Sequence, residues 1–121
     1  MRGRVLEYVP EKLKTTKFCL EAVKQNVWVF KYVPEKLKTT KFCIEAVKQN
    51  YYLFKYVPDE LKTAEMCLEA IKENVWVFEY VPEKLKTPKF WIEAVKQNKE
   101  ALGYVPMRLQ DEIRAALKFN D

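Results

Sequence analysis

Three cysteines recur at a fixed interval along the chain and are the first residues that could do chemistry. Cys19, Cys43 and Cys67 lie 24 residues apart, and Trp91 stands at the next equivalent position. Stacked repeats would hold equivalent atoms on the order of 10 Å apart, whereas a zinc–sulfur bond is about 2.3 Å long and a disulfide needs Cα atoms within about 7 Å. Because a tryptophan replaces the fourth cysteine, we predict buried, reduced thiols that act as small apolar side chains and hold no metal or cofactor.

Charged residues repeat at the same interval as the cysteines. The carboxylates are Glu21, Glu45, Glu69 and Glu93, and the lysines are Lys24, Lys48, Lys72 and Lys96. Catalysis needs a distinct constellation of groups in a pocket, which a ladder of identical groups does not supply. The chain also has no histidine and only 2 glycines, which excludes a histidine-activated nucleophile and a glycine-rich phosphate loop. We therefore expect no enzyme and no catalytic residues, and we interpret these ladders as a solvated face with helix salt bridges.

An aromatic ladder is the strongest candidate for a binding surface. It consists of Trp28, Tyr52 and Trp76, again 24 residues apart. The equivalent positions nearest the two ends are Arg4 and Glu100, which are polar. Aromatic residues in the central repeats with polar residues at both ends indicate a docking stripe for a protein or peptide partner, or for self-association. The alternative is that these rings pack between repeats.

The lysine content raises the possibility of nucleic-acid binding. The net charge is +5 at pH 7, and Lys14, Lys38 and Lys86 recur in basic repeats. However, residues 56–79 contain six acidic residues against two lysines. An acidic repeat interrupts any basic track, and binding to a phosphate backbone depends on continuous neutralisation. Nucleic acid is therefore the second interpretation.

The interval itself predicts the architecture. Tyr-Val-Pro begins at residues 8, 32, 56, 80 and 104 without an insertion between copies. A fixed period of this length is typical of a solenoid, in which each unit buries its apolar face against its neighbours. We predict an all-α, single-domain solenoid over residues 1–121, with five 24-residue repeats of which the last is a cap. The predicted units are 8–31, 32–55, 56–79, 80–103 and the C-terminal cap 104–121.

Each unit should contain one capped helix and one shorter, bent helical segment. The first helix is predicted from about Thr16 to Gln25, with Thr15 as its N-terminal cap. Asn26 and its equivalents should end the helices in a left-handed conformation, and the cap changes to Asp111 in the last copy. The remaining segment, "VWVFKYVPEKLK", could be a strand, but its apolar residues follow a helical spacing. We therefore favour a short helix that bends before the proline.

The units are similar to a known group of repeats. "YVPEKLKT" followed by "FCLEAVKQN" resembles tandem helical repeats in bacterial proteins of unknown function, whose typical unit is like "AVKQNGxALxYVPEELK". The resemblance covers roughly residues 6–105 and implies an all-α repeat fold. The glycine usual after the asparagine is replaced here by Val27, Tyr51, Val75 and Lys99. The resemblance implies no activity.

The leading functional interpretation is a non-enzymatic interaction scaffold. A consensus-designed repeat protein is a further alternative, because the copies are so close in sequence. We expect no membrane association, because no apolar run approaches the roughly 18 residues that a membrane span needs. The start of the chain has no apolar signal region, so a cytoplasmic location is expected.

Overall fold

The computed structural model describes residues 8–118 of the 121-residue chain. These residues form α-helices and 3-10 helices with turns between them, and no strand occurs in this part of the chain. The predicted all-α repeat fold is thus confirmed for residues 8–118. The chain divides into two compact units, Met1–Lys62 (unit 1) and Thr63–Asp121 (unit 2). Whether they act as the single predicted domain stays a prediction, and each unit is described by itself.

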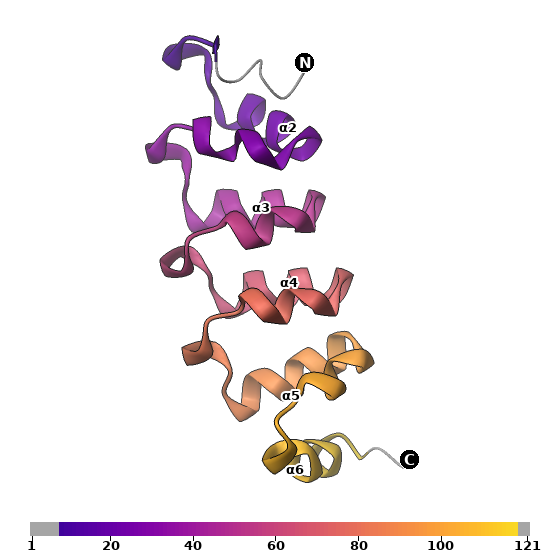
Figure 1. The fold of residues 1–121 in the computed structure, drawn as a ribbon. Coiled ribbons are helices and arrows are strands. Elements are labelled where there is room, and N and C mark those ends of the chain that lie inside the picture. The colour runs from indigo at the N-terminus through magenta and orange to yellow at the C-terminus, as the bar shows by residue number, and fades with distance from the viewer. Residues whose placement is uncertain (1–7, 119–121) are drawn as a thin grey trace. The chain divides into compact units, whose positions relative to one another are not determined.

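Unit 1 consists of stacked helices that alternate between two kinds. Its elements in chain order are η1 (Glu11–Leu13), α2 (Thr16–Gln25), η2 (Val27–Tyr32), η3 (Glu35–Leu37), α3 (Thr40–Gln49), η4 (Tyr51–Tyr56) and η5 (Asp59–Leu61), where η denotes a 3-10 helix. The α-helices α2 and α3 pack side by side (Figure 1), and η2 packs against η4. Like elements therefore pack on like elements, as expected when successive repeats stack.

Unit 2 has the same alternation and ends in a longer helix. Its elements are α4 (Ala64–Glu73), η6 (Val75–Tyr80), η7 (Glu83–Leu85), α5 (Pro88–Gln97), η8 (Lys99–Tyr104) and α6 (Met107–Leu117). The helix α5 packs against both α4 and α6, and η6 packs against η8. A helix with a neighbour on each side needs a wide apolar face, and α5 accordingly buries Phe90, Trp91, Ala94 and Val95.

Threonine caps fix where the repeated α-helices begin. The side chain of Thr15 accepts a hydrogen bond from the Phe18 amide at 3.2 Å, so α2 begins at Thr16 as predicted. The same bond recurs at the start of the other three repeated helices, from Thr39, Thr63 and Thr87. In α5 the first helical residue is Pro88, which lacks the amide that a first-turn residue leaves unpaired anyway.

The segment that was ambiguous in sequence forms two 3-10 helices. In unit 1, η2 ends at Tyr32, and Val33 is extended with φ −71° and ψ 134°. Proline disfavours the α region for the residue before it, so Pro34 breaks the helix at Val33. The turn η3 follows directly at Glu35–Leu37. The preference for a bent helix over a strand is confirmed, and the helices are of the tighter 3-10 type.

The predicted left-handed asparagine caps are wrong. All four asparagines are extended, with φ between −160° and −152°: Asn26, Asn50, Asn74 and Asn98. Each Oδ1 instead accepts the amide hydrogen two residues ahead and caps the following 3-10 helix, as Asn26 does for Trp28 at 3.0 Å. The asparagine is the one residue between each α-helix and the following 3-10 helix, so it is needed to start the next helix, which a left-handed cap would not do.

The predicted cap at Asp111 is also wrong. The last helix, α6, begins at Met107 directly after Pro106 and contains Asp111 in its interior. In the other repeats a Lys-Thr pair separates the post-proline turn from the α-helix, and the last copy has Gln110 and Asp111 there instead. Without the threonine break, the turn continues as one helix. Its one buried side chain is Ile113, which is fully enclosed.

Candidate functional site

The aromatic ladder occupies the second position of three 3-10 helices. Trp28, Tyr52 and Trp76 are 67%, 63% and 70% exposed, respectively. The asparagine cap of each helix holds the aromatic residue's own backbone amide, at distances of 2.9–3.1 Å. The two residues that follow each ring are buried: Val29 and Phe30, Leu53 and Phe54, Val77 and Phe78. The helix core is therefore filled without the ladder rings, and a fixed backbone presents them outward.

Two contacts support the ladder rings in unit 1. The Trp28 ring packs against Tyr56 with 5.5 Å between ring centroids and a tilt of 50°. The Tyr52 ring stacks on its neighbour Tyr51 at 4.5 Å, and a hydrogen bond with the Tyr51 side chain raises the pKa of Tyr52. The rings are thus held at the surface by other aromatic residues. Among the polar residues at the equivalent end positions, Glu100 is exposed, whereas Arg4 lies outside the described residues.

The three cysteines lie in the core of their repeats. Cys19, Cys43 and Cys67 are free thiols with no solvent exposure. Burial raises the pKa of Cys19, and it raises the pKa of Cys43 to about 11. Groups of three or more His, Cys, Asp or Glu side chains that could hold a metal ion do not occur within residues 8–118. The three thiols therefore occupy packing positions, and the raised pKa of Cys19 and Cys43 favours the protonated thiol over the nucleophilic thiolate at these two positions.

The lysines considered for nucleic-acid binding are enclosed rather than extended into solvent. The side chains of Lys14, Lys38 and Lys86 are only 9%, 12% and 19% exposed, and each pairs with a glutamate three residues earlier at 2.9–3.8 Å. The equivalent Lys62 is 3% exposed, pairs with Asp59 at 3.3 Å and lies 4.5 Å from the centre of the Phe54 ring. These ammonium groups stabilise the repeat, which reduces their availability to a phosphate backbone.

The glutamate and lysine ladders lie along the α-helices, as the periodicity predicted. Lys72 pairs with Glu69 at 3.7 Å, and Lys96 pairs with Glu93 at 3.5 Å. In α3 the Oε1 atom of Glu45 is buried with no hydrogen-bond partner in the described part of the chain. These pairs are exposed or half-exposed and add at most a few tenths of a kcal/mol each.

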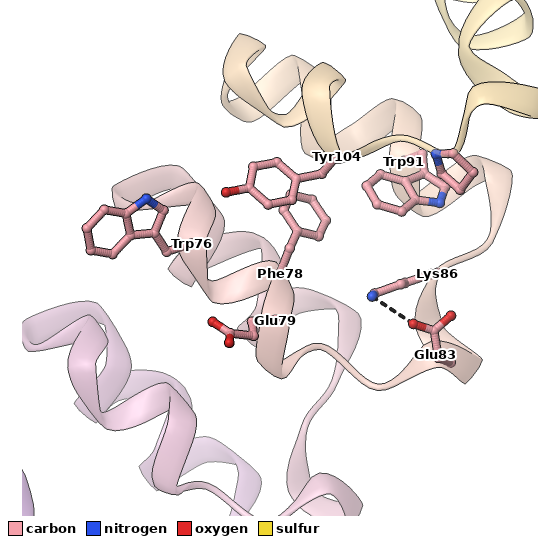
Figure 2. A pocket seen from close by; sticks show the side chains of 8 residues that line it. Trp76, Phe78, Glu79, Glu83, Lys86, Trp91 and Tyr104 are labelled. Carbon is pink, nitrogen blue, oxygen red and sulfur yellow. Dashed lines mark hydrogen bonds and ion pairs between the residues drawn. The ribbon is translucent and has the colours of Figure 1, made fainter.

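Unit 2 contains a surface pocket that the sequence did not reveal. It has a volume of about 410 Å³ and is lined by Trp76, Phe78, Glu79, Glu83, Lys86, Trp91, Tyr104 and Pro106. Figure 2 shows Tyr104 lying over Phe78, with Trp76 and Glu79 to one side of these rings and the Lys86–Glu83 ion pair to the other. Four aromatic rings from three elements of unit 2 thus meet around one hollow.

Ring stacking holds the base of this pocket together. Phe78 stacks on Trp91 at 4.8 Å and on Tyr104 at 5.2 Å, with interplanar angles of 18° and 20°. The sequence contained two signals for the site, which were the replacement of the repeated cysteine by Trp91 and of the repeated Lys31 by Glu79. Both departures from the repeat pattern fall in the same pocket, which only the folded chain could show.

Capped α-helices alternating with 3-10 helices at a constant period define the chain as an all-α tandem-repeat protein. The sequence belongs to the family described as "Domain of unknown function (DUF4116)", which matches in four overlapping stretches, residues 1–38, 17–62, 39–86 and 64–110. No curated protein and no solved structure matches the chain. None of the helices in residues 8–118 has the length and apolar character needed to cross a membrane.

Proposed function

We propose that the chain is a non-enzymatic interaction scaffold that docks a protein or peptide partner through the exposed rings of the aromatic ladder, Trp28 and Tyr52 in unit 1 and Trp76 in unit 2. The observation that carries this proposal is the high exposure of all three rings, 63–70%, next to residues that are fully packed. Exposed tryptophan and tyrosine side chains are enriched among the residues that dominate binding energy at protein interfaces. A second copy of the chain is a possible partner.

The repeat does not need an aromatic residue at this position for its own stability. Glu100 occupies the equivalent position in η8, where Asn98 caps its amide at 3.0 Å, as the other asparagines do for the ladder residues. The following residue, Ala101, is buried in the same way as Val29. The capped 3-10 helix therefore forms with a glutamate at this position as well, which favours a role in binding for the aromatic residues. We also propose a cytoplasmic location, which the three free, buried thiols support because thiols stay reduced in that compartment.

The test compares two variants for binding to peptides selected on the intact protein from a random displayed library. Replacement of both tryptophans, Trp28→Ala with Trp76→Ala, should abolish binding of the selected peptides, since hot-spot aromatic residues each contribute about 2 kcal/mol or more. Glu100→Ala, at the equivalent exposed position, is the matched control and should leave binding unchanged. Equal binding by the double variant would contradict the proposal.

The same variants test self-association and folding. Sedimentation velocity of the unmodified chain over a range of concentrations shows whether it dimerises, and the double variant should then be monomeric. The free energy of unfolding should fall by only about 1 kcal/mol, mainly because the Trp28–Tyr56 contact is lost. If the free energy of unfolding falls by several kcal/mol, the rings are structural and the proposal is wrong.

A further inference from the structure

The residues that line the pocket of unit 2 have counterparts in unit 1, and the aromatic contacts of the two sets differ. Residues 48 positions apart correspond, so that Trp76, Phe78 and Tyr104 are the counterparts of Trp28, Phe30 and Tyr56. In unit 1 the tyrosine packs against the tryptophan at 5.5 Å. In unit 2 Tyr104 stacks on Phe78 instead, at 5.2 Å. The tyrosine thus takes a different partner in unit 2, and the hollow lies beside Trp76 (Figure 2).

The difference begins at the position of the repeated cysteine. In unit 1 the ammonium group of Lys38 lies over the Phe30 ring, 4.7 Å from its centre. In unit 2 the indole of Trp91 lies against the equivalent Phe78 ring at 4.8 Å. The equivalent lysine, Lys86, pairs with Glu83 at 2.9 Å, as Lys38 pairs with Glu35 at 3.2 Å. The phenylalanine of unit 2 is thus contacted by a tryptophan, whereas that of unit 1 is contacted by a lysine.

The residues that precede the corresponding tyrosines also differ in charge between the two units. In unit 1 a lysine precedes Tyr32 and Tyr56, the counterparts of Tyr80 and Tyr104, and lies over the ring that follows it: Lys31 over Tyr32 and Lys55 over Tyr56, both at 5.3 Å. In unit 2 the residue before Tyr80 is Glu79, and the residue before Tyr104 is Gly103. Unit 1 thus supplies its own cations to its aromatic surface. At the equivalent positions unit 2 has the carboxylate of Glu79 and, at Gly103, no side chain. The space beside Gly103 is open, because a Cβ added there would meet no atom within 4 Å.

The charge and the aromatic rings of the pocket therefore favour binding of a cation that the chain itself does not supply. Lys86 and Glu83 offset one another, whereas Glu79 is exposed and forms no ion pair with any described residue. The pocket accordingly carries one uncompensated negative charge beside aromatic rings. Aromatic faces bind alkylated ammonium groups well, because the ring quadrupole attracts the charge and the methyl groups are weakly hydrated. A volume of about 410 Å³ accommodates such a head group and part of the chain that carries it.

We propose that the pocket of unit 2 lined by Trp76, Tyr104, Trp91 and Glu79 binds a quaternary or methylated ammonium group. Trp76 and Tyr104 supply ring faces, Trp91 and Phe78 form the base, and Glu79 supplies the opposite charge. The head group belongs either to a small molecule or to a methylated lysine side chain of a peptide, and the two share this chemistry. The site does not rest on the docking proposal, since apart from Trp76 none of these residues belongs to the aromatic ladder.

The first experiment titrates the intact protein with choline and with its neutral carbon isostere 3,3-dimethyl-1-butanol, followed by tryptophan fluorescence and by calorimetry. We expect choline to bind with a dissociation constant on the order of 1 mM and the isostere to bind at least about tenfold more weakly, because it lacks the charge.

A trimethyllysine peptide and its unmethylated form are titrated in parallel. Tighter binding of the methylated peptide than of choline identifies a peptide-borne group, and the reverse identifies a small molecule. Equal binding of choline and its isostere, or no binding of any ammonium probe, overturns the proposal.

The second experiment uses the repeat as its own control. Glu79→Gln should weaken choline binding about tenfold, and Gly103→Lys should block it by placing an ammonium over Tyr104, as Lys55 does over Tyr56. Lys31→Gln, at the position of unit 1 that corresponds to Glu79, is the matched control and should leave choline binding unchanged. Glu79→Gln leaves the aromatic ladder intact, so peptides that dock on the ladder should still bind this variant. Unchanged choline binding in both the Glu79 and Gly103 variants would overturn the proposal even if ladder docking is confirmed.

Discussion

The side chain of Asn50 ties its own repeat to the preceding one through the carbonyl oxygen of Lys24. Its Nδ2 donates a hydrogen bond to that oxygen at 3.1 Å, while its Oδ1 accepts the Tyr52 amide at 3.1 Å. Asn98 does the same in unit 2, where it donates to the carbonyl of Ile71 at 3.1 Å and accepts the amide of Glu100 at 3.0 Å. One amide therefore satisfies an unpaired carbonyl at the end of one α-helix and caps the next 3-10 helix.

This double role makes Asn50 more important than a single cap. We expect Asn50→Ala to lower the free energy of unfolding by about 2 kcal/mol, because it removes a cap and leaves the Lys24 carbonyl without its partner. Asn50→Asp keeps the accepting oxygen but loses the donor, so its cost should be smaller. Chemical denaturation measures both, with the exposed neighbour Gln49→Ala as the control. Equal stability of the alanine and control variants would contradict the role inferred for the asparagine.

The enclosed lysines should stabilise the fold through the apolar methylene chain of the side chain as well as through the ammonium charge. The side chain of Lys62 is 3% exposed, and its ammonium lies between Asp59 and the fully buried Phe54 ring. Lys62→Ala should cost about 1–2 kcal/mol of unfolding free energy, since it removes both the apolar stem and the cation–π contact. Lys62→Met keeps an apolar chain of similar length and should cost less. The exposed Lys36→Ala is the control. If Lys62→Ala is as stable as this control, the lysine is not structural.

The buried thiols predict a loss of stability at alkaline pH. Burial raises the pKa of Cys43 from 9.0 to about 11 in the folded chain. The protonated form is therefore favoured by folding, and its contribution is complete below pH 9 and is lost as the pH rises toward 11. Between these values the contribution should fall by about 1.4 kcal/mol per pH unit. The difference in unfolding free energy between the unmodified chain and Cys43→Ala should shrink over this range. A difference that stays constant from pH 8 to pH 11 would contradict the shifted pKa.

The last helix should stabilise unit 2 through one side chain. Ile113 is the buried residue of α6, which packs on α5. Ile113→Ala should cost about 2–4 kcal/mol, the usual range for a truncated core residue, whereas Glu112→Ala at an exposed neighbouring position should be nearly neutral. Removing residues 104–121 should have the larger effect, because it exposes the stacked faces of Phe78 and Trp91. A truncated chain as stable and soluble as the full one would show that this segment is not a cap.

The sequence alone determined the architecture and the boundaries of the repeated α-helices. Thr15 and its equivalents predicted where the helices begin, because a capping oxygen is a local interaction between residues three apart. The exposure of Trp28 also followed from helical phase, since Val29 and Phe30 point toward the core and are buried. These inferences were correct because the repeat period and the local hydrogen bonds do not depend on distant residues.

The tertiary structure decided what depends on contacts between repeats. The hydrogen bond from Asn50 to the carbonyl of Lys24, 26 residues earlier, joins two repeats, and no local pattern could indicate that partner. The extended conformation itself is local, because Asn26 adopts it as well while it caps the following 3-10 helix. The pocket of unit 2 depends likewise on Tyr104 lying over Phe78, which belongs to the preceding repeat. Glu79 and Trp91 are separate departures from the repeat along the sequence. Only the stacking of repeats brings them to one site, because residues 12 positions apart on different helices share a surface only after packing.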